Sequence, residues 1–129
     1  MNIIGNGVDI IDNSRIKRSI KKKGFLKRIY SNKELIEAKK IKNKVNFFAK
    51  RFAAKEAFVK SLGTGFRNGI NFKDISINND LYGKPKIQVS SNIKQYIKKK
   101  LKVKNYKIFL SLADEKNFSI AYVIINIEN

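Results

Sequence analysis

Apolar and polar residues follow two different periodicities along the chain, and together they predict a mixture of strands and helices. An apolar, β-branched run at residues 3–11 predicts a buried strand close to the N-terminus. The longest helical pattern covers about residues 46–62 and ends at Gly63, since glycine is typical of the position after a helix. Towards the C-terminus, residues 107–113 and 118–127 predict a hairpin around a polar turn.

Shorter elements are predicted between these segments. A basic helix is predicted over about residues 15–23, after candidate caps at 12–14, and a second helix starts with the capping box Ser31–Glu34. Strands are predicted at residues 74–78 and 86–90, and a further helix is capped by Ser91. Because several strands follow one another directly in sequence, the pattern is typical of an α+β fold. We expect one domain over residues 1–129, with a mostly antiparallel sheet packed against helices.

Composition supports a folded domain and excludes several kinds of chemistry. The 129 residues suit a single domain, and 43% hydrophobic content is enough to build a core, which excludes intrinsic disorder. The chain has no cysteine and no histidine, which excludes disulfides, thiolate catalysis, Cys/His zinc sites and Ser-His-Asp triads. Any metal must be bound by oxygen ligands, which favours a hard cation such as Mg²⁺.

The net charge of +19 favours an acidic partner, although part of it reflects a general enrichment in lysine. Nucleic acid, an anionic membrane and an acidic protein all remain open on charge alone. No stretch approaches the roughly 18 apolar residues of a transmembrane helix, and the N-terminus lacks the basic segment of a signal peptide. We therefore expect a soluble, cytoplasmic protein.

Glu56 is out of place in the predicted long helix. At 100° per residue it shares the apolar face with Phe52 and Val59. A carboxylate buried there without a partner costs several kcal/mol, so it must be paired or bound to a cation. The simplest structural explanation is a salt bridge to Lys60, four residues on, or to the adjacent Lys55.

Asp9 is a second unusual carboxylate, because it lies inside the apolar run at residues 3–11. Its structural explanation is a strand-end residue that caps the following helix. Together with Glu56, however, it favours an Mg²⁺ site, since Mg²⁺ typically takes one or two carboxylates, several waters and phosphate oxygens.

Basic residues around Glu56 would suit a polyphosphate ligand. Arg51, Lys55 and Lys60 lie on the same predicted helix, and the Gly63-Thr64-Gly65 loop follows it. Backbone N–H groups of such a loop can approach a phosphate, although a lone Gly-x-Gly is more often only a helix stop.

Two motifs give the sequence a specific resemblance. Gly7-Val8-Asp9-Ile10-Ile11 with Arg15 forms the first, and the second is the block Arg-Phe-Ala-Ala-Lys-Glu-Ala-Phe-Val-Lys-Ser-Leu-Gly-Thr-Gly at residues 51–65. Further agreement lies at residues 30–35, 83–85 and 111–114. The chain resembles holo-[acyl-carrier-protein] synthase, the short bacterial type of 4′-phosphopantetheinyl transferase, over essentially its whole length. The resemblance implies the fold of that family.

The resemblance also implies a reaction. The family transfers the 4′-phosphopantetheine arm of coenzyme A to a serine of apo acyl carrier protein, releases adenosine 3′,5′-bisphosphate and supports fatty acid biosynthesis. The ligands of its Mg²⁺, which Mn²⁺ can replace, fall on Asp9 and Glu56. Lys60 would stabilise the phosphates and is a candidate acid for the leaving group. The base is left open among Glu56, Asp9 and a metal-bound water.

The family's binding residues can be carried over to this chain. Those for coenzyme A fall on Arg51, Lys60, Gly63, Thr64, Gly65, Lys84, Pro85 and Ser111, and those for the acidic carrier protein on Arg15, Lys21, Lys22 and Arg28. The resemblance further implies a homotrimer with active sites between subunits. Asp114 stands where many members have histidine, so no histidine can act there in this chain.

Two functions of other classes compete with this interpretation. A nucleic-acid-binding module would use the basic surface and aromatic stacking, but Phe47, Phe48, Phe52 and Phe58 lie in apolar surroundings that core packing explains better. A non-catalytic binder of acidic proteins would leave the two carboxylates without a role. We therefore expect neither nucleic acid nor a membrane as partner.

Overall fold

The computed structural model describes residues 2–67 and 69–128. Its elements are β1 (Asn2–Asp12), α1 (Asn13–Ser19), α2 (Phe25–Ile29), α3 (Asn32–Ala38), α4 (Lys44–Leu62), a short 3₁₀ helix (Phe72–Asp74), β2 (Ile75–Asn79), β3 (Pro85–Val89), α5 (Ser91–Lys99), β4 (Tyr106–Asp114) and β5 (Phe118–Ile127). The expected α+β class is confirmed. Within the described residues, no helix combines the length and the apolar character needed to cross a membrane.

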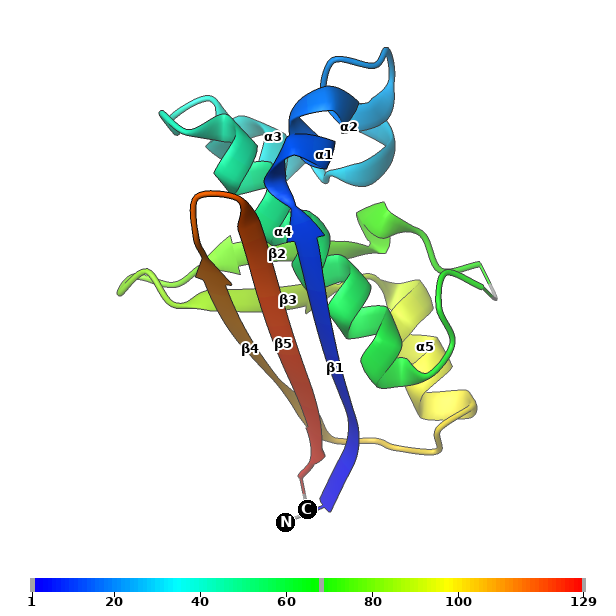
Figure 1. The fold of residues 1–129 in the computed structure, drawn as a ribbon. Helices are drawn as coiled ribbons and strands as arrows, with labels where there is room; N and C mark the ends of the chain where they lie inside the picture. Colours follow the sequence, from blue (N-terminus) through cyan, green and yellow to red (C-terminus); the bar gives the residue numbers. More distant parts are fainter. Residues whose placement is uncertain (1, 68, 129) are drawn as a thin grey trace.

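The strands form two antiparallel sheets (Figure 1). The larger has the order β1-β5-β4, and the predicted hairpin of β4 and β5 is confirmed. The smaller consists of β2 and β3. Since β5 is central, β1 and β4 are the two edges of the larger sheet, and this separation decides where the candidate site residues lie.

Helix α4 packs across one face of the larger sheet, close to β1 (Figure 1). The approach requires glycine at two positions of β1, because a Cβ at Gly5 would overlap the carbonyl oxygen of Ser61 and one at Gly7 that of Ala57. Glycine thus lets the strand and the helix backbone come together. Asp9, two residues beyond Gly7 on the same face of β1, is consequently held against α4.

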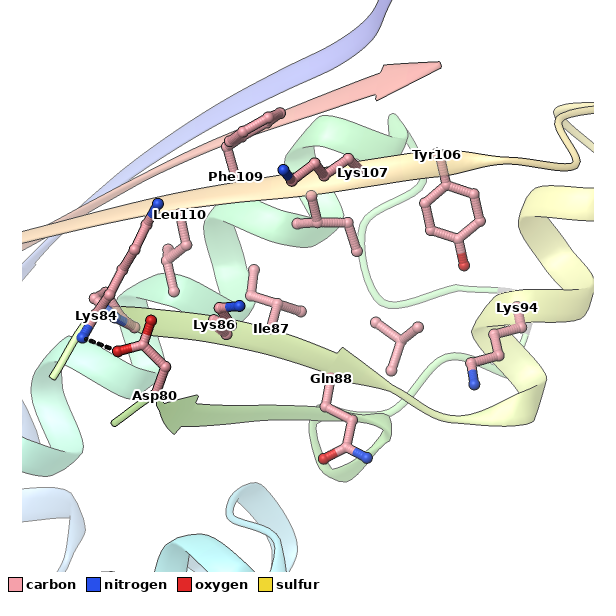
Figure 2. Close-up of a pocket in the computed structure, with 13 residues that line it drawn as sticks. Asp80, Lys84, Lys86, Ile87, Gln88, Lys94, Tyr106, Lys107, Phe109 and Leu110 are labelled. Atoms are coloured by element: carbon pink, nitrogen blue, oxygen red, sulfur yellow. Dashed lines mark hydrogen bonds between the residues drawn. The ribbon is translucent and has the colours of Figure 1, made fainter. Parts of the chain in front are cut away.

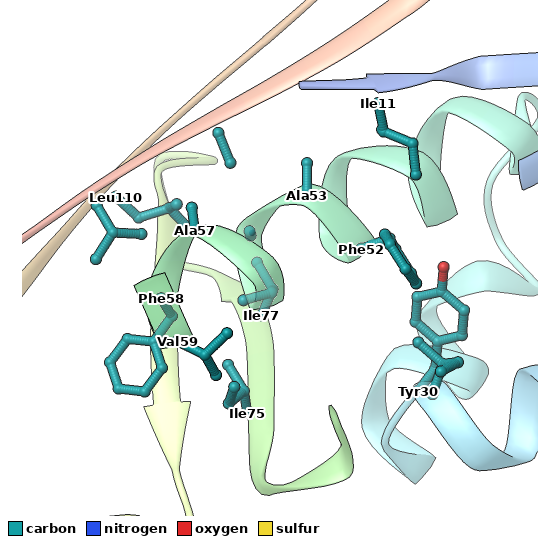
Figure 3. Close-up of a cluster of buried hydrophobic side chains, with 14 of the residues drawn as sticks. Ile11, Tyr30, Phe52, Ala53, Ala57, Phe58, Val59, Ile75, Ile77 and Leu110 are labelled. Atoms are coloured by element: carbon teal, nitrogen blue, oxygen red, sulfur yellow. The ribbon is translucent and has the colours of Figure 1, made fainter. Parts of the chain in front are cut away.

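Helix α4 supplies much of the core. Phe47, Phe48, Phe52 and Phe58 are all buried, so the expectation that they pack in the core is confirmed. Figure 3 shows Phe52 and Phe58 within this cluster. Each such ring stabilises the fold by roughly 1.5–3 kcal/mol through removal of apolar surface from water.

The predicted basic helix at residues 15–23 is wrong in its extent. Helix α1 ends at Ser19, and a second short helix, α2, begins after Gly24. Gly24 has φ of 82°, which glycine adopts without strain, and there the chain reverses so that Phe25 and Ile29 reach the core. Burial of these two apolar side chains stabilises the fold more than continuation of a lysine-rich helix would.

Of the three predicted helix-end signals, two are confirmed and one is wrong. The capping box of Ser31 and Glu34 is confirmed, with the Ser31 N–H donating to Glu34 Oε1 at 2.9 Å. Gly63 ends α4 in the left-handed region as predicted. The prediction that Ser91 caps α5 is wrong, because Ser90 occupies the cap position and Ser91 is the first helical residue.

Candidate active site

Asp9 and Glu56 come together at the contact of β1 with α4. Glu56 is partly buried, and its pKa is raised by that burial and then by the negative charge of Asp9. The positive charges of Lys60 and Arg15 oppose the rise in the pKa of Glu56. A carboxylate that is desolvated and also faces a second carboxylate favours a nearby cation.

Neither salt bridge expected for Glu56 forms. Lys60 Nζ instead donates to Asp9 Oδ1 and to the carbonyl oxygen of Val8, both at 3.0 Å. Lys55 pairs with Glu34. The structural explanation for Glu56 is therefore wrong, because its two candidate lysines are directed to other carboxylates.

The expectation that Lys55 faces a polyphosphate is also wrong. Its ammonium is fully buried and donates to Glu34 Oε1 at 2.7 Å, to the Phe72 carbonyl at 3.0 Å and to the Ile75 carbonyl. Burial lowers the pKa of Lys55, and the charge of Glu34 opposes that change. Glu34 also accepts from the Ile77 N–H at 3.1 Å, so the pair joins α3, β2 and α4.

The structural explanation offered for Asp9 is also wrong. Asp9 lies within β1 opposite Ala121, three residues before the strand ends. The helix cap is Asp12, whose Oδ1 accepts from the Ser14 N–H at 2.9 Å. Asp9 is thus free of a capping role, and Lys60 is its ion-pair partner.

The donor set at this position fits Mg²⁺ or Mn²⁺. Asp9 and Glu56 supply two carboxylates, and the described residues contain no cluster of three or more acidic side chains. Two carboxylates leave most of an octahedral coordination shell to water and to oxygens of a bound phosphate. The arrangement matches a metal that is shared with a phosphorylated substrate.

A second group of candidate residues lines a different cleft. Arg51, Lys84, Pro85 and Ser111 border a space of about 350 Å³, with Lys50 beside them. This is the set, apart from Lys60 and the glycine loop, that the resemblance assigns to coenzyme A. The cleft has the positive charge that an anionic ligand requires.

Arg51 is the most unusual member of this cleft. Only 4% of it is exposed, its guanidinium carbon lies 3.6 Å from the centroid of the Phe47 ring, and its Nε has no hydrogen-bond partner. Burial lowers the pKa of Arg51, opposed chiefly by the charge of Glu34. A buried donor left unpaired is costly, and the stacking of the guanidinium on Phe47 holds it in this position.

A larger groove of about 540 Å³ adjoins this cleft between β3 and β4 (Figure 2). The two share Lys84, Pro85 and Leu110. Figure 2 shows Lys84 next to Asp80, whose Oδ1 accepts from the Lys84 N–H at 2.9 Å. That hydrogen bond shapes the turn that places Lys84 at the junction of the two spaces.

The two groups lie at opposite edges of the larger sheet. Asp9 is on β1 and Ser111 on β4, with β5 between them. On α4, Arg51 and Glu56 are five positions apart and therefore point about 140° away from each other around the helix axis. Among the residues that the structure describes, those lining the Arg51 cleft include neither Asp9 nor Glu56.

The glycine loop continues from the carboxylate side of α4. Gly63 and Gly65 both have positive φ, and Thr64 Oγ1 donates to the Gly65 carbonyl at 2.7 Å. The loop begins at the C-terminal end of α4, three residues after Lys60, and none of its residues lines the Arg51 cleft.

The four candidate docking residues gather at one end of the molecule. Arg15 lies on α1, Lys21 and Lys22 in the turn after it, and Arg28 on α2, and all four are exposed (Figure 1). The Arg15 guanidinium lies 5.7 Å from the Phe52 ring centroid. Because Arg15 also lowers the pKa of Glu56, this basic surface extends to the carboxylates.

A polar cluster between α1, α4 and the hairpin was missed by sequence reasoning. Asp114 was singled out, but its partners were not: Asn46 Nδ2 donates to Asp114 Oδ2 at 2.6 Å, and Lys50 Nζ lies 3.8 Å from Oδ1. No local pattern marks such asparagines, because their partners lie far away in the sequence.

Comparison with known proteins gives a consistent result. Residues 5–123 match the model of the 4′-phosphopantetheinyl transferase superfamily. A holo-[acyl-carrier-protein] synthase of Pelagibacter ubique is 53% identical over 125 residues, covering 97% of this chain and 98% of the relative. The crystal structure of the synthase from Neisseria meningitidis aligns with a TM-score of 0.87 at 37% identity, covering 96% of this chain and 98% of that one. The Bacillus anthracis synthase, solved in complex with CoA (3′,5′-ADP), aligns with a TM-score of 0.82 at 34% identity, covering 99% and 100%.

Proposed function

Since the chain belongs to the 4′-phosphopantetheinyl transferase superfamily and to the holo-[acyl-carrier-protein] synthases within it, we propose that it transfers the 4′-phosphopantetheine arm of coenzyme A to a serine of apo acyl carrier protein. The reaction releases adenosine 3′,5′-bisphosphate and depends on Mg²⁺, with Mn²⁺ as a substitute. The observation that carries the proposal is the pair Asp9 and Glu56, two neighbouring carboxylates that belong to no larger acidic cluster among the described residues and that Lys60 borders.

Asp9 and Glu56 would hold the metal, which supplies charge neutralisation at the pyrophosphate of coenzyme A. The protein's part is to fix the two carboxylates, Asp9 by the close packing of β1 on α4 and Glu56 by the rotation of that helix. Phosphoryl-type transfer relies on such positioning more than on a covalent enzyme intermediate. Lys60 lies where its ammonium can move from Asp9 to a phosphate oxygen, because its side chain is more than half exposed.

Glu56 and Asp9 are the two candidate side-chain bases for the serine hydroxyl, because both border the proposed metal position. Asp9 Oδ1 accepts a hydrogen bond from the Lys60 ammonium at 3.0 Å. A metal-bound water is the remaining candidate.

The Arg51 cleft would receive the nucleotide end of coenzyme A. Arg51, together with Lys50, Lys84 and Ser111, would offer donors for a phosphate monoester. The glycine loop would lie along the pyrophosphate and contact its oxygens through backbone N–H groups beyond Gly63, whose own N–H donates to the Lys60 carbonyl at 3.0 Å.

A homotrimer would unite the two groups of residues. Because the carboxylates and the Arg51 cleft lie at opposite edges of the sheet, a neighbouring protomer can complete each site across an interface. The sheet face away from α4 offers an apolar surface for such contacts. Its large exposed side chains include Val8, Ile10, Phe109, Phe118, Ile120 and Tyr122.

The carrier protein would dock on the basic surface of α1 and α2. Arg15, Lys21, Lys22 and Arg28 face solvent there, and acyl carrier proteins are strongly acidic. The proposal includes a role in fatty acid biosynthesis, since the product carries acyl chains, and a cytoplasmic location, where coenzyme A is found.

The direct test is mass spectrometry of an apo acyl carrier protein incubated with the enzyme, coenzyme A and Mg²⁺. A mass gain of one phosphopantetheine arm is expected, and omission of the metal should abolish it. The matched control is a carrier protein whose acceptor serine is replaced by alanine. Absence of transfer, under conditions where another synthase modifies the same carrier, would contradict the proposal.

A further inference from the structure

The side chain of Asn13, the first residue of α1, joins three parts of the molecule. Asn13 is buried, at 5% exposure. Its Nδ2 donates to Asn46 Oδ1 at 3.2 Å and to the carbonyl oxygens of Glu115 and Lys116 at 3.3 and 3.2 Å. Its Oδ1 accepts from Ser119 Oγ at 2.7 Å. Both ends of this buried amide are thus satisfied, Nδ2 by α4 and the β4–β5 turn and Oδ1 by the second residue of β5.

The same cluster continues to Asp114. Asn46 accepts from Asn13 through Oδ1 and donates through Nδ2 to Asp114 Oδ2 at 2.6 Å. The backbone N–H of Asn13 also donates to the Asn117 carbonyl at 2.8 Å. The orientation of each amide is consistent with that of its neighbour, so the start of α1 is tied to the hairpin turn by an ordered chain of hydrogen bonds.

Helix α1 needs such an anchor because it is only seven residues long. A helix of that length is not stable in water by itself, so tertiary contacts must set its direction. Along its inner face Ile16 is 1% exposed and fixes the middle of the helix. The hydrogen bonds of Asn13 fix its beginning. The outer face carries the exposed Arg15 and Arg18.

We propose that Asn13 is a positioning residue for carrier-protein docking: with Asn46 and Asp114 it sets the direction of α1 and so aligns the arginines of that helix with an acidic partner. This inference rests on the proposed function. It also gives Asp114 a role that needs no contact with coenzyme A.

The test compares Asn13→Ala and the milder Asn46→Ala with the wild-type enzyme. Each is expected to raise KM for the carrier protein roughly three- to tenfold while leaving KM for coenzyme A and kcat close to wild type. A purely structural loss would lower the folded fraction, hence the apparent kcat, without changing KM. Ser31→Ala is the matched control, because it removes a helix-capping hydroxyl of α3 away from α1.

A double-mutant cycle with Arg15→Ala provides a second readout. If Asn13 acts through α1, then Asn13→Ala raises KM less in an Arg15→Ala enzyme than in the wild type, because one of the arginines that it aligns is already gone. Fully additive effects on KM would overturn the inference. An unchanged KM for carrier protein in both asparagine variants, or an equal rise in Ser31→Ala, would also overturn it.

These outcomes are distinguishable from failure of the proposed function. Wild-type transfer to the carrier protein is measured first, and its absence would count against the proposed function itself. Normal wild-type transfer with an unchanged KM in the asparagine variants would overturn only the role of Asn13. Should Asn13→Ala fold poorly, the Asn46→Ala enzyme and its combination with Arg15→Ala decide the question, since Asn46 is only partly buried.

Discussion

Helix α4 carries two lysines, Lys55 and Lys60, that each pair with a carboxylate from another element. One pair is buried and the other is partly exposed. Lys55 Nζ lies 2.7 Å from Glu34 Oε1, and both side chains are fully buried. Lys60 Nζ lies 3.0 Å from Asp9 Oδ1, and 53% of the Lys60 side chain and 16% of the Asp9 side chain are exposed. The buried ammonium also donates to two backbone carbonyls, whereas the exposed one donates to the carbonyl of Val8.

The environment separates a structural pair from a functional one. Breaking a buried ion pair leaves an uncompensated charge and costs roughly 3–5 kcal/mol, whereas an exposed pair contributes about 0–1 kcal/mol. Lys55 therefore fixes the rotation of α4, and Lys60 can leave Asp9 at little cost. Glu56, next to Lys55 in sequence, is directed towards Asp9 as a consequence of that fixed rotation.

The largest expected effect is on turnover, at the carboxylates. Asp9→Asn and Glu56→Gln should each lower kcat/KM by roughly 10³-fold, because loss of a metal-held charge removes several kcal/mol of transition-state stabilisation. Steady-state kinetics over a range of Mg²⁺ concentrations provides the measurement. Thermal unfolding should show that both variants remain folded, and near-normal turnover in either would remove that residue from the metal site.

Lys55→Met should mainly lower stability, in contrast to the carboxylate variants, which should lose turnover and remain folded. We expect a loss of about 3 kcal/mol in the free energy of unfolding, because Glu34 would remain buried without its counter-charge. Urea denaturation measures this loss. Adding Glu34→Gln should restore part of it, since the amide oxygen still accepts from the backbone while the charge is gone. A loss below about 1 kcal/mol in Lys55→Met would contradict the structural assignment.

Lys60→Met should leave stability almost unchanged and reduce activity. The exposed pair predicts a change in unfolding free energy within about 1 kcal/mol, whereas loss of a phosphate contact predicts a fall of roughly 10²-fold in kcat/KM. Lys60→Arg is the matched control because it retains the charge. If Lys60→Met destabilised the protein as much as Lys55→Met, the contrast between the two pairs would be wrong.

The smallest expected effect is the pH dependence of stability that comes from Glu56. Burial and Asp9 raise its pKa in the folded protein, so the folded state binds the proton more tightly than the unfolded chain. Ionisation of Glu56 therefore costs stability as pH rises through and above its ordinary value. In the presence of EDTA, Glu56→Gln should be slightly more stable than wild type at pH 7, and the difference should shrink towards about pH 4. Urea denaturation at both pH values measures it, and a wild type more stable than Glu56→Gln at pH 7 would contradict the sign.

Local patterns predicted most of the elements because their causes are local. The Ser31–Glu34 capping box, the end of α4 at Gly63 and the β4–β5 hairpin each depend on residues close in sequence. The division of residues 15–23 into α1 and the turn before α2 was not predicted, because it depends on the burial of Phe25 and Ile29 against distant parts of the chain.

The candidate site was predicted in part. Asp9 and Glu56 were conspicuous because charge is costly in an apolar pattern, and the structure brings them together. The roles of the lysines were not apparent in the same way, since Lys55 and Lys60 have similar local surroundings in the sequence. The network of Asn13 and Asn46 left no local signal, because its hydrogen bonds span 33 to 106 residues.

The sequence by itself determined the family through its motifs, the α+β class and the two carboxylates, because each follows from residue identity and short-range spacing. Only the tertiary structure decided which lysine is buried with Glu34 and which remains available beside Asp9. It also decided that the carboxylates and the Arg51 cleft lie at opposite edges of one sheet. The physical reason is that burial and long-range pairing, rather than residue type, fix the partner of each charge.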